Sequence, residues 1–303
     1  MTELTVLQQK MAAFEAACVL KFNEPMSKHT SFHIGGGAEV MAFPKTREEL
    51  ASVLRIAAEL GHMPAILGAG TNVLAPDAGI SGIVICLKDC MDGMELLDEN
   101  RIRVMAGVTM TRAAIFAANH GLGGLEFAHG IPGTIGGGVF MNAGAYGGEM
   151  KDIVENVEIM DFRGNIQVFS NEEMGFSYRH SVLEGKDLIV LSATLRLEKE
   201  EPETIKAKMR ELQTKRSASQ PLDMPSAGSA FKRPVGGYAA ALIDQAGLKG
   251  YRVGDAAIST KHAGFAVNLG SATASDVRAL LQQVSDIVFE KNGIQLEPEV
   301  RIW

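Results

Sequence analysis

Apolar positions along this chain repeat at two spacings, one helical and one typical of strands. Between Thr46 and Gly61 the apolar residues lie three and four positions apart, and Thr46 and Glu49 form a capping box; this pattern predicts a helix that ends at Gly61. Further helices are predicted over residues 111–119, 203–215 and 275–289. Strands are predicted at residues 65–67, 83–87, 101–106, 154–159 and 188–197, a polar loop at 217–229 and an extended end at 294–303. The pattern indicates a mixed α+β chain without a regular βαβ series.

The composition of the chain changes near residue 200, where a charged segment, Lys199–Pro202, ends in proline. A chain of 303 residues is typical of about two domains. We therefore expect a boundary near residues 198–202. The expected division is 1–19, a helix packed on the surface; 20–198, the first domain; and 199–303, the second.

Composition and charge exclude several classes of protein. With 46% apolar and 21% charged residues, the chain is globular rather than disordered. Its apolar runs are far shorter than the roughly 18 residues of a membrane helix, and residues 1–20 lack a signal-peptide pattern, so no membrane insertion and a cytoplasmic location are expected. The net charge of −7 with no basic block argues against nucleic acid as a partner.

Cysteine and histidine usage gives no sign of a metal centre. The three cysteines are Cys18, Cys86 and Cys90, and the seven histidines are scattered. The pair Cys86-x3-Cys90 has no second pair to complete a zinc site. We expect no metal, a reducing compartment, and Cys86 and Cys90 to serve as small buried hydrophobes.

Glycine is concentrated in two loops. Eleven of the 28 residues from Gly121 to Gly148 are glycine, and the runs Gly68–Asn72 and Gly130–Gly138 stand out. Glycine lets the backbone approach a ligand closely, and exposed amides can hold a diphosphate. One such run could be a tight turn, but two runs and the nearby Asn142–Tyr146 favour a ligand cradle.

The first glycine run does not have the form of a common nucleotide-binding motif. Residues Gly68–Val73 read GxGxxV, so the third glycine of the dinucleotide fingerprint is missing, and a strand rather than a helix follows. No GxxxxGK[ST] sequence is present. A Rossmann site and a P-loop are therefore both disfavoured.

Several segments together resemble the UDP-N-acetylenolpyruvoylglucosamine reductases, also called UDP-N-acetylmuramate dehydrogenases. The matching segments, in family order, are His29-Thr30 with Ile34–Gly36, Leu67–Leu74, Gly130–Gly137, Met141–Gly148, Phe176–Arg179, Gly228–Lys232 and Leu296–Arg301. Thr71 replaces the family's usual serine, and Arg233 its usual asparagine. No insertion precedes the strand at Leu188, so the chain resembles the shorter, second type of the family.

This resemblance implies the fold, the reaction and the cofactor. It implies an α+β fold with a two-lobed FAD-binding region of the vanillyl-alcohol-oxidase type over residues 20–198, split near residue 90, and an α+β substrate domain over 199–303. The implied reaction is the NADPH-dependent, FAD-mediated reduction of the enolpyruvyl ether of UDP-N-acetylglucosamine to UDP-N-acetylmuramate in peptidoglycan synthesis. FAD would be bound non-covalently, NADPH would be the co-substrate, and a monomer is expected.

The resemblance also assigns site residues. It implies contacts with FAD from the glycine loops and the stretch after them: Gly68, Ala69, Gly70, Thr71, Asn72, Gly130, Ile131, Pro132, Gly133, Thr134, Gly136, Gly137, Asn142, Gly144 and Ala145. It implies catalytic roles for Arg179, Ser229 and Glu299, and contacts with substrate for Tyr178 and Lys232.

The chemistry of the implied reaction suits these residue types. A hydride added to one alkene carbon leaves negative charge on the other carbon and on its carboxylate. A guanidinium such as that of Arg179 stabilises such charge with a forked pair of bonds. A hydroxyl such as that of Ser229 can donate the proton if it lies close to the carbanion carbon.

Other interpretations remain open for the residues and for the chain. Taken singly, Arg179 fits a surface arginine, Ser229 a loop serine and Glu299 a strand-surface carboxylate, and His129 fits a loop histidine better than a covalent flavin link. The chain could be another FAD-linked oxidoreductase acting on alcohols or sugars, or a regulator that binds flavin or nucleotide sugar without catalysis. The joint occurrence of Ser229, Lys232 and Glu299 favours the reductase.

Overall fold

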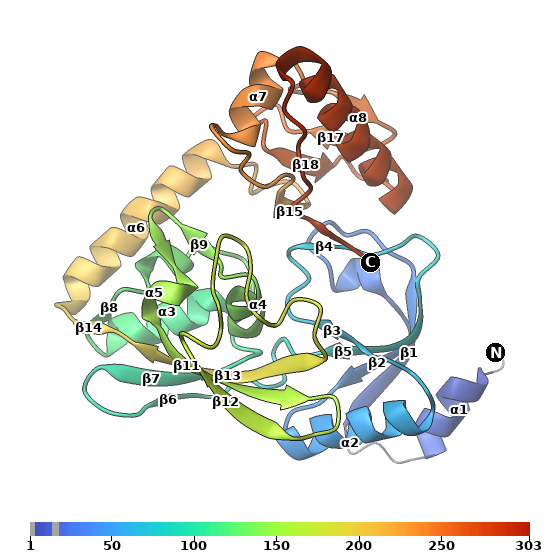
Figure 1. Cartoon of the computed structure of the whole chain (residues 1–303), viewed down its shortest axis with the longest axis vertical. Coiled ribbons are helices and arrows are strands. Elements are labelled where there is room, and N and C mark those ends of the chain that lie inside the picture. Colours follow the sequence, from blue (N-terminus) through green and yellow to red (C-terminus); the bar gives the residue numbers. More distant parts are fainter. Residues whose placement is uncertain (1–3, 14–17) are drawn as a thin grey trace. The chain divides into compact units, whose positions relative to one another are not determined.

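The computed structural model describes residues 4–13 and 18–303, which alternate between helices and strands (Figure 1). The helices are α1 (Val6–Ala13), α2 (Arg47–Glu59), α3 (Met110–Asn119), α4 (Ile135–Phe140), α5 (Met150–Ile153), α6 (Pro202–Ser219), α7 (Ala239–Gln245) and α8 (Ala274–Asn292), with short 3-10 turns η1 (Met26–Lys28) and η2 (Glu126–Ala128). The first ten strands are β1 (Val19–Pro25), β2 (Gly37–Phe43), β3 (Ala65–Leu67), β4 (Val73–Leu74), β5 (Ile80–Cys86), β6 (Met94–Leu96), β7 (Arg101–Met105), β8 (Leu122–Gly123), β9 (Gly144–Ala145) and β10 (Gly148–Glu149). The others are β11 (Val154–Asp161), β12 (Ile166–Ser170), β13 (Leu188–Arg196), β14 (Glu198–Lys199), β15 (Ser226–Ser229), β16 (Arg252–Val253), β17 (Ala256–Ile258), β18 (Phe265–Asn268) and β19 (Arg301–Ile302).

The chain divides into two compact units that are not contiguous in sequence. Unit 1 contains the described residues up to Phe22, together with Glu39–Ala69 and Gly82–Lys215. Unit 2 contains Asn23–Ala38, Gly70–Ser81 and Arg216–Trp303. This division differs from the contiguous one predicted from the sequence, because two N-terminal segments fold with the C-terminal residues.

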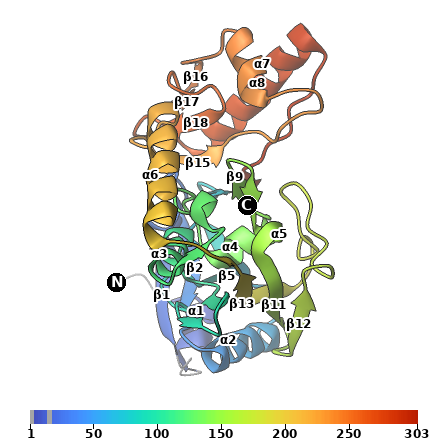
Figure 2. The same ribbon diagram turned by 90° about the vertical axis from the view of Figure 1, so that its left-hand side faces the viewer.

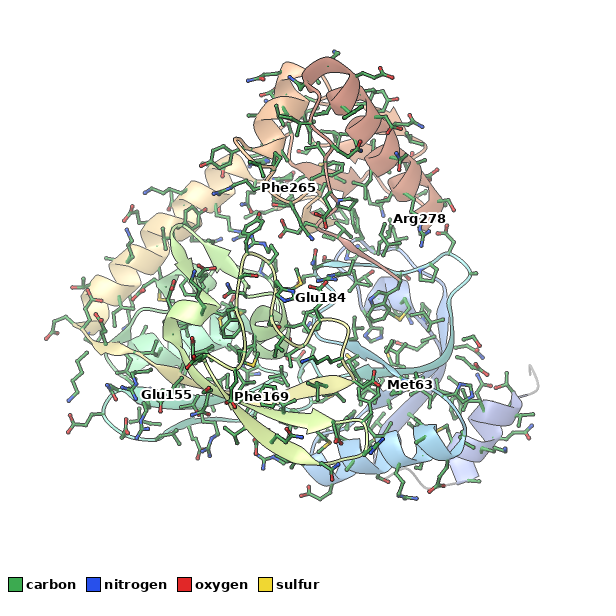
Figure 3. All side chains as sticks on the ribbon, viewed as in Figure 1. Met63, Glu155, Phe169, Glu184, Phe265 and Arg278 are labelled. Atoms are coloured by element: carbon green, nitrogen blue, oxygen red, sulfur yellow. The ribbon has the colours of Figure 1, made fainter. Side chains whose placement is uncertain are left out.

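Unit 1 is built on two larger sheets. One has the strand order β12-β11-β13-β7-β6, and every neighbouring pair in it is antiparallel. The other has the order β1-β2-β5-β3, with β3 and β5 parallel. Glu155 and Phe169 mark the neighbouring strands β11 and β12 in Figure 3. Glu155 also pairs with Arg101 at 3.2 Å and Arg196 at 2.9 Å, so this carboxylate links three strand regions of the sheet.

Helix α2 confirms the apolar period read from the sequence but only half of the predicted capping box, because the Glu49 carboxylate accepts from the Lys45 amide at 2.6 Å instead of from the Thr46 amide. The Thr46 side chain accepts a hydrogen bond from the Glu49 amide, which satisfies one of the free amides at the start of the helix. Leu50, Val53 and Ala57 are fully buried in the core of unit 1. These apolar residues therefore form the face of α2 that packs against the core of unit 1.

Unit 2 combines a small antiparallel sheet, ordered β15-β18-β17-β16, with two helices. Figures 1 and 2 show α7 and α8 side by side in this unit. Thr273 caps α8, and Gly293 ends it in the left-handed conformation at φ 68°. At the end of the chain, β19 pairs in parallel with β4.

The N-terminal segments of unit 2 are held there by burial and by hydrogen bonds. Phe32 and Leu74 are buried in the same apolar cluster as Leu280 of α8. The buried Asn268 side chain donates to the Phe32 carbonyl at 3.0 Å, and the Ser31 hydroxyl donates to the Ser226 carbonyl at 2.5 Å. These contacts explain why residues 23–38 and 70–81 belong to unit 2.

The polar segment 217–229 differs from the loop that the sequence predicts. Helix α6 continues to Ser219, and Ser226–Ser229 forms strand β15. This strand exists because Ser226 and Ser229 pair with Val267 and Phe265 of β18. A partner so distant in sequence gives no local signal.

Within the residues that the structure describes, no helix combines the length and apolarity needed to cross a membrane.

Asp77 ties the segment 70–81 to the start of α8. Its Oδ1 accepts from the Ala274 amide at 2.6 Å, and its Oδ2 accepts from the amide and the hydroxyl of Ser275 at 3.0 Å. Burial acts to raise the pKa of Asp77, but these hydrogen bonds outweigh it, so the pKa lies below its ordinary value. The ionised carboxylate therefore stabilises the folded unit.

We expect Asp77→Ala to lower the free energy of unfolding by about 1 kcal/mol at neutral pH, the usual loss for a helix cap. Because the folded-state pKa is lowered, the difference from wild type should be complete above the unfolded-state pKa of about 3.9 and should vanish as pH falls through the lower folded-state value. Urea unfolding at several pH values measures this. Asp223→Ala is the control, and an Asp77→Ala deficit that persists at the lowest pH would contradict the assignment.

Candidate functional site

The two predicted glycine loops come together inside unit 1. Gly68 follows strand β3, and Thr134 precedes helix α4. A Cβ atom built on Gly68 would lie 2.6 Å from Oγ1 of Thr134, closer than real Cβ contacts allow. The Thr134 side chain is buried and accepts from the Gly137 amide at 3.3 Å, so it has little freedom to move away. Glycine at position 68 is what allows the loops to meet.

The other glycines of these loops fall into two kinds. A Cβ on Gly136 would lie 3.0 Å from Cβ of Ala106, and one on Gly144 would lie 2.7 Å from Cβ of Glu149. Packing within the protein accounts for both. Gly137 is different: it is exposed, and a Cβ there would meet only Oγ1 of Thr134 at an ordinary 3.6 Å. Packing in the fold therefore does not require glycine at position 137.

His129, directly before Gly130, has a buried ring nitrogen that needs a partner. In the part of the chain that the structure describes, Nδ1 of His129 is buried and has no hydrogen-bond partner. Burial lowers the pKa of His129, so the ring is neutral at neutral pH. An orphaned polar atom beside a glycine loop fits a site that a bound ligand completes.

Tyr178 and Arg179 form the tip of a tight hairpin in unit 1. The amides and carbonyls of Ser177 and His180 bond each other at 3.1 and 3.2 Å. Arg179 adopts a φ of 56°, and its guanidinium carbon lies 5.0 Å from the centre of the Tyr178 ring. The predicted arginine and tyrosine are thus presented together by one turn.

Asn142 is placed differently from the cofactor contact that the sequence predicts for it. The residue is fully buried, with an exposed fraction of 0%. Its amide nitrogen donates to Oε2 of Glu149 at 2.7 Å and to the Ser177 carbonyl at 3.0 Å, and its oxygen accepts from the Lys151 amide at 2.9 Å. The side chain is therefore used inside the protein, and no part of the residue is exposed.

In unit 2, the end of the chain brings Ser229 and Glu299 to neighbouring backbone segments. The Glu299 amide donates to the Ala230 carbonyl at 2.9 Å, and Phe231 pairs with Pro298 in an antiparallel bridge. Ser229 follows a register shift in the pairing of β15 with β18, and Gly228 before it has a φ of 75°. A bulge of this kind turns the next side chain away from its regular direction.

The second half of the first glycine run lies in unit 2, beside the same segment. Asn72 donates from its side chain to the Glu299 carbonyl at 3.1 Å, and its own carbonyl accepts from the Arg301 amide at 2.9 Å. Gly70 has a φ of 63°, and a Cβ there would lie 2.0 Å from the His29 carbonyl oxygen. Residues 70–72 are therefore packed tightly by backbone contacts.

Two cations of unit 2 follow Ser229 in the chain. Lys232 forms an ion pair with Glu297, whose side chain is 70% exposed. The guanidinium carbon of Arg233 lies 4.5 Å from the centre of the Tyr238 ring. Such exposed ion pairs contribute at most about 1 kcal/mol. Lys232 can therefore exchange its carboxylate partner for an anionic ligand at little cost.

The cysteines are neutral thiols, and Cys86 is buried as predicted, whereas Cys90 is only half-buried. Burial raises the pKa of Cys86 to about 11 and also raises the pKa values of Cys18 and Cys90. None is activated as a nucleophile. Among residues 4–13 and 18–303, no group of three or more histidine, cysteine, aspartate or glutamate side chains is arranged to hold a metal.

The sequence did not point to the residues that support the Arg179 hairpin. Ser181 is buried and donates to the Phe140 carbonyl at 2.8 Å, and Glu149 accepts from Asn142. Neither belongs to a glycine loop or carries reactive chemistry. The only local signal was the Glu149–Asp152 capping box at the start of α5.

Two family models match separate parts of this chain. The model described as "FAD binding domain" matches residues 38–170. The model described as "UDP-N-acetylenolpyruvoylglucosamine reductase, C-terminal domain" matches residues 220–303. The glycine loops 68–72 and 130–137 lie within the first match, and Ser229, Lys232 and Glu299 lie within the second.

Individual relatives match almost the whole chain. A UDP-N-acetylenolpyruvoylglucosamine reductase of Caldanaerobacter subterraneus is 49% identical over 93% of this chain and 93% of the relative. The reductase of Clostridioides difficile is 44% identical over the same shares. The crystal structure of the Thermus caldophilus reductase covers 94% of this chain and 98% of its own, with 37% identity and a TM-score of 0.78.

A more distant solved structure shares the fold alone. Alkyldihydroxyacetonephosphate synthase covers 66% of this chain and 42% of its own, with 13% identity and a TM-score of 0.50. Together with the family models, the matches confirm the predicted fold class, an α+β chain with a FAD-binding region of the vanillyl-alcohol-oxidase type and a C-terminal reductase domain. The resemblance drawn from the sequence motifs is confirmed as well.

We expect Gly137→Ala to separate the stability of the protein from its affinity for FAD. Alanine in a helix is more favourable than glycine by about 0.5–1 kcal/mol, so the FAD-free protein should not lose stability. If FAD lies against the loop, the added methyl group should lower the fraction of purified protein that retains it. Absorbance ratios and thermal unfolding measure both effects. Gly237→Ala is the control, because a Cβ there meets nothing within 4 Å. Full FAD content in Gly137→Ala would show that FAD does not lie against Gly137.

Proposed function

This chain belongs to the UDP-N-acetylenolpyruvoylglucosamine reductase family of flavin-dependent oxidoreductases, and we propose that it reduces the enolpyruvyl ether of UDP-N-acetylglucosamine to UDP-N-acetylmuramate. NADPH is the proposed electron donor, and peptidoglycan synthesis the proposed pathway. The observation that carries this proposal is the pairing of residues 230–231 with 298–299, which holds Ser229 and Glu299 together within the reductase domain.

The FAD-binding region supplies the support for the cofactor. When bound, FAD supplies the hydride chemistry that amino-acid side chains lack. In our proposal the loop that contains Gly68 and the loop 130–137 hold FAD without a covalent bond. The close approach of Gly68 to Thr134 and the orphaned Nδ1 of His129 support this assignment.

Ser229 is the proposed proton donor to the substrate. Hydride addition to one carbon of the double bond leaves carbanion character on the other, and a hydroxyl close to that carbon can protonate it. Serine is a weak acid, but the carbanion is a strong base, so position matters more than acidity. The bulge at Gly228 supports the proposal because it sets the direction of this side chain.

Arg179 and Glu299 are the proposed stabilisers of the intermediate. A guanidinium can form two charge-assisted bonds to the carboxylate over which the negative charge spreads. Glu299 is proposed to stabilise the enolic form of this intermediate.

The substrate also carries a diphosphate, and a protein of net charge −7 needs local cations to bind it. Lys232 is the proposed contact for a phosphate and Tyr178 for the substrate.

The proposed reaction also suggests where the protein works. Reduced nicotinamide cofactors and nucleotide sugars are metabolites of the cytoplasm, so we place the protein there. We propose a monomer as the working form.

We expect Ser229→Ala to slow one half reaction and not the other. Reduction of FAD by NADPH needs no proton from Ser229, whereas protonation of the substrate carbon does. A positioned general acid contributes about 10²- to 10⁴-fold in rate. Stopped-flow measurement should therefore show normal bleaching of the flavin by NADPH and at least about a hundredfold slower reoxidation by the UDP-sugar.

A second serine of the same strand provides the control for this experiment. Ser226→Ala removes a hydroxyl from β15 without touching the proposed proton donor. It should leave both half reactions near the wild-type rates. Equal slowing of both half reactions in Ser229→Ala would show that Ser229 supports the flavin site, and no slowing would show that another group is the acid.

We expect Lys232→Ala to raise the KM for the UDP-sugar while leaving flavin reduction by NADPH nearly unchanged. Loss of a single charge-assisted bond to phosphate corresponds to about 1.5–3 kcal/mol, or roughly 10- to 100-fold in binding. Lys249→Ala is a matched control because Lys249 is also paired with a carboxylate of unit 2, Asp244, at 2.8 Å. An unchanged KM in Lys232→Ala would show that Lys232 is a solvated surface lysine that does not contact the UDP-sugar.

A further inference from the structure

One buried side chain joins two hairpins of unit 1. The first hairpin pairs β9 with β10, with Gly148 opposite Ala145. The second is the turn of Ser177–His180 that carries Tyr178 and Arg179. Asn142 bonds Glu149 of the first and Ser177 of the second through the same amide nitrogen.

The bonding capacity of Asn142 matches its surroundings. A side-chain amide has two N–H donors and one carbonyl acceptor. One donor serves Glu149, the other serves the Ser177 carbonyl, and the oxygen accepts from the Lys151 amide. Aspartate supplies the acceptor but neither donor, and alanine supplies nothing. Only an amide of this length satisfies all three partners.

The Arg179 hairpin depends on such anchors because its tip buries little. Tyr178 is 48% exposed, and Arg179 has a φ of 56°, a conformation that disfavours residues other than glycine. Contacts that hold the hairpin, besides the two bonds across the turn, include the bond from Asn142 to the Ser177 carbonyl, the bond from the Ser181 hydroxyl to the Phe140 carbonyl, and the pairing of His180 with Glu184 at 2.7 Å. The Val182 amide also donates to the Met174 carbonyl at 2.8 Å. Figure 3 shows Glu184 on the loop that follows the hairpin.

Among these contacts, the bond from Asn142 is made to the residue directly before the tip formed by Tyr178 and Arg179. The Ser177 carbonyl belongs to the peptide group that leads into Tyr178, and its distance to Nδ2 of Asn142 is 3.0 Å. The donor itself is fully buried and backed by Lys151 and Glu149. The bond from Asn142 therefore ties the hairpin to a buried part of unit 1 directly before Tyr178.

We propose that Asn142 is a positioning residue, which places Arg179 for its reaction by holding the Ser177 carbonyl. The proposal rests on the proposed role of Arg179. A displacement of a catalytic group by about 1 Å can cost about 100-fold in rate. Loss of the bond should therefore slow the step that uses Arg179, although Asn142 touches neither substrate nor the reacting atoms.

The first test is Asn142→Asp, which keeps the size and the acceptor but removes both donors and faces Glu149 with a second carboxylate. We expect reoxidation of the reduced flavin by the UDP-sugar to slow by about 10- to 100-fold. Reduction of the flavin by NADPH should stay close to the wild-type rate. Equal rates for wild type and variant in the reoxidation step would overturn the proposal.

A double variant separates the two bonds of the amide nitrogen. Asn142→Asp combined with Glu149→Gln exchanges amide and carboxylate, which removes the repulsion and restores a hydrogen bond between the two side chains. The Ser177 carbonyl still lacks the donor from residue 142 and keeps only the bond from the His180 amide. We expect thermal stability and FAD content to recover while reoxidation stays slow. Recovery of the reoxidation rate would show that the bond to Ser177 does not position Arg179.

Hydrogen exchange tests the positioning without any catalysis. The amides of Ser177 and His180 are bonded across the turn, and both should exchange faster in the double variant than in wild type. The control is Asn171→Ala, which removes an amide that donates to the carbonyls of Lys151 and Val154 at 2.8 and 2.7 Å. Unchanged exchange at Ser177 and His180 in the double variant, or an equal increase in Asn171→Ala, would overturn the proposal. Failure of the proposed function would instead appear as wild-type protein that does not turn over the UDP-sugar.

Discussion

Close packing of the Thr134 side chain against Gly68 is the constraint on which the FAD-binding region depends. Any side chain at that position would meet Oγ1 of Thr134 at 2.6 Å. Thr134 cannot yield easily because it is buried and caps α4 through the Gly137 amide. The meeting of strand β3 with α4 therefore requires both a glycine on one side and a small capping residue on the other. Glycine-rich sequence in this protein reflects packing first, and the cradle for a ligand follows from it.

The last residues of the chain serve a similar purpose in unit 2. Residues 297–299 pair with 230–232, and residues 301–303 pair with 72–74. One extended segment thus fixes both Ser229 and the end of the first glycine run. The arrangement explains why a segment without regular secondary structure over most of its length carries a candidate catalytic glutamate. The position of Glu299 is set by its backbone bonds to Ala230 and Asn72.

Local patterns predicted some of the elements, because their causes are local, but strands β1, β2 and β12 and helix α7 were not predicted. The cap from Thr46 and the apolar residues after it lie within one helix, and β3 has the predicted bounds, Ala65–Leu67. The division into units and strand β15 were not predicted, because both depend on partners far away in the sequence, such as Phe265 for Ser229. Motifs identified the candidate residues but not their use: the structure shows that the side chain of Asn142 serves the protein itself, while Gly137 is left open.

We propose that this protein passes electrons from NADPH through FAD to a UDP-sugar enolpyruvyl ether. An anaerobic titration of the purified wild-type protein tests it most directly. Addition of NADPH should bleach the visible absorbance of the flavin, and subsequent addition of the enolpyruvyl ether of UDP-N-acetylglucosamine should restore it in proportion to the amount added. A flavin that stays bleached with this substrate and recovers only when oxygen is admitted would contradict the account.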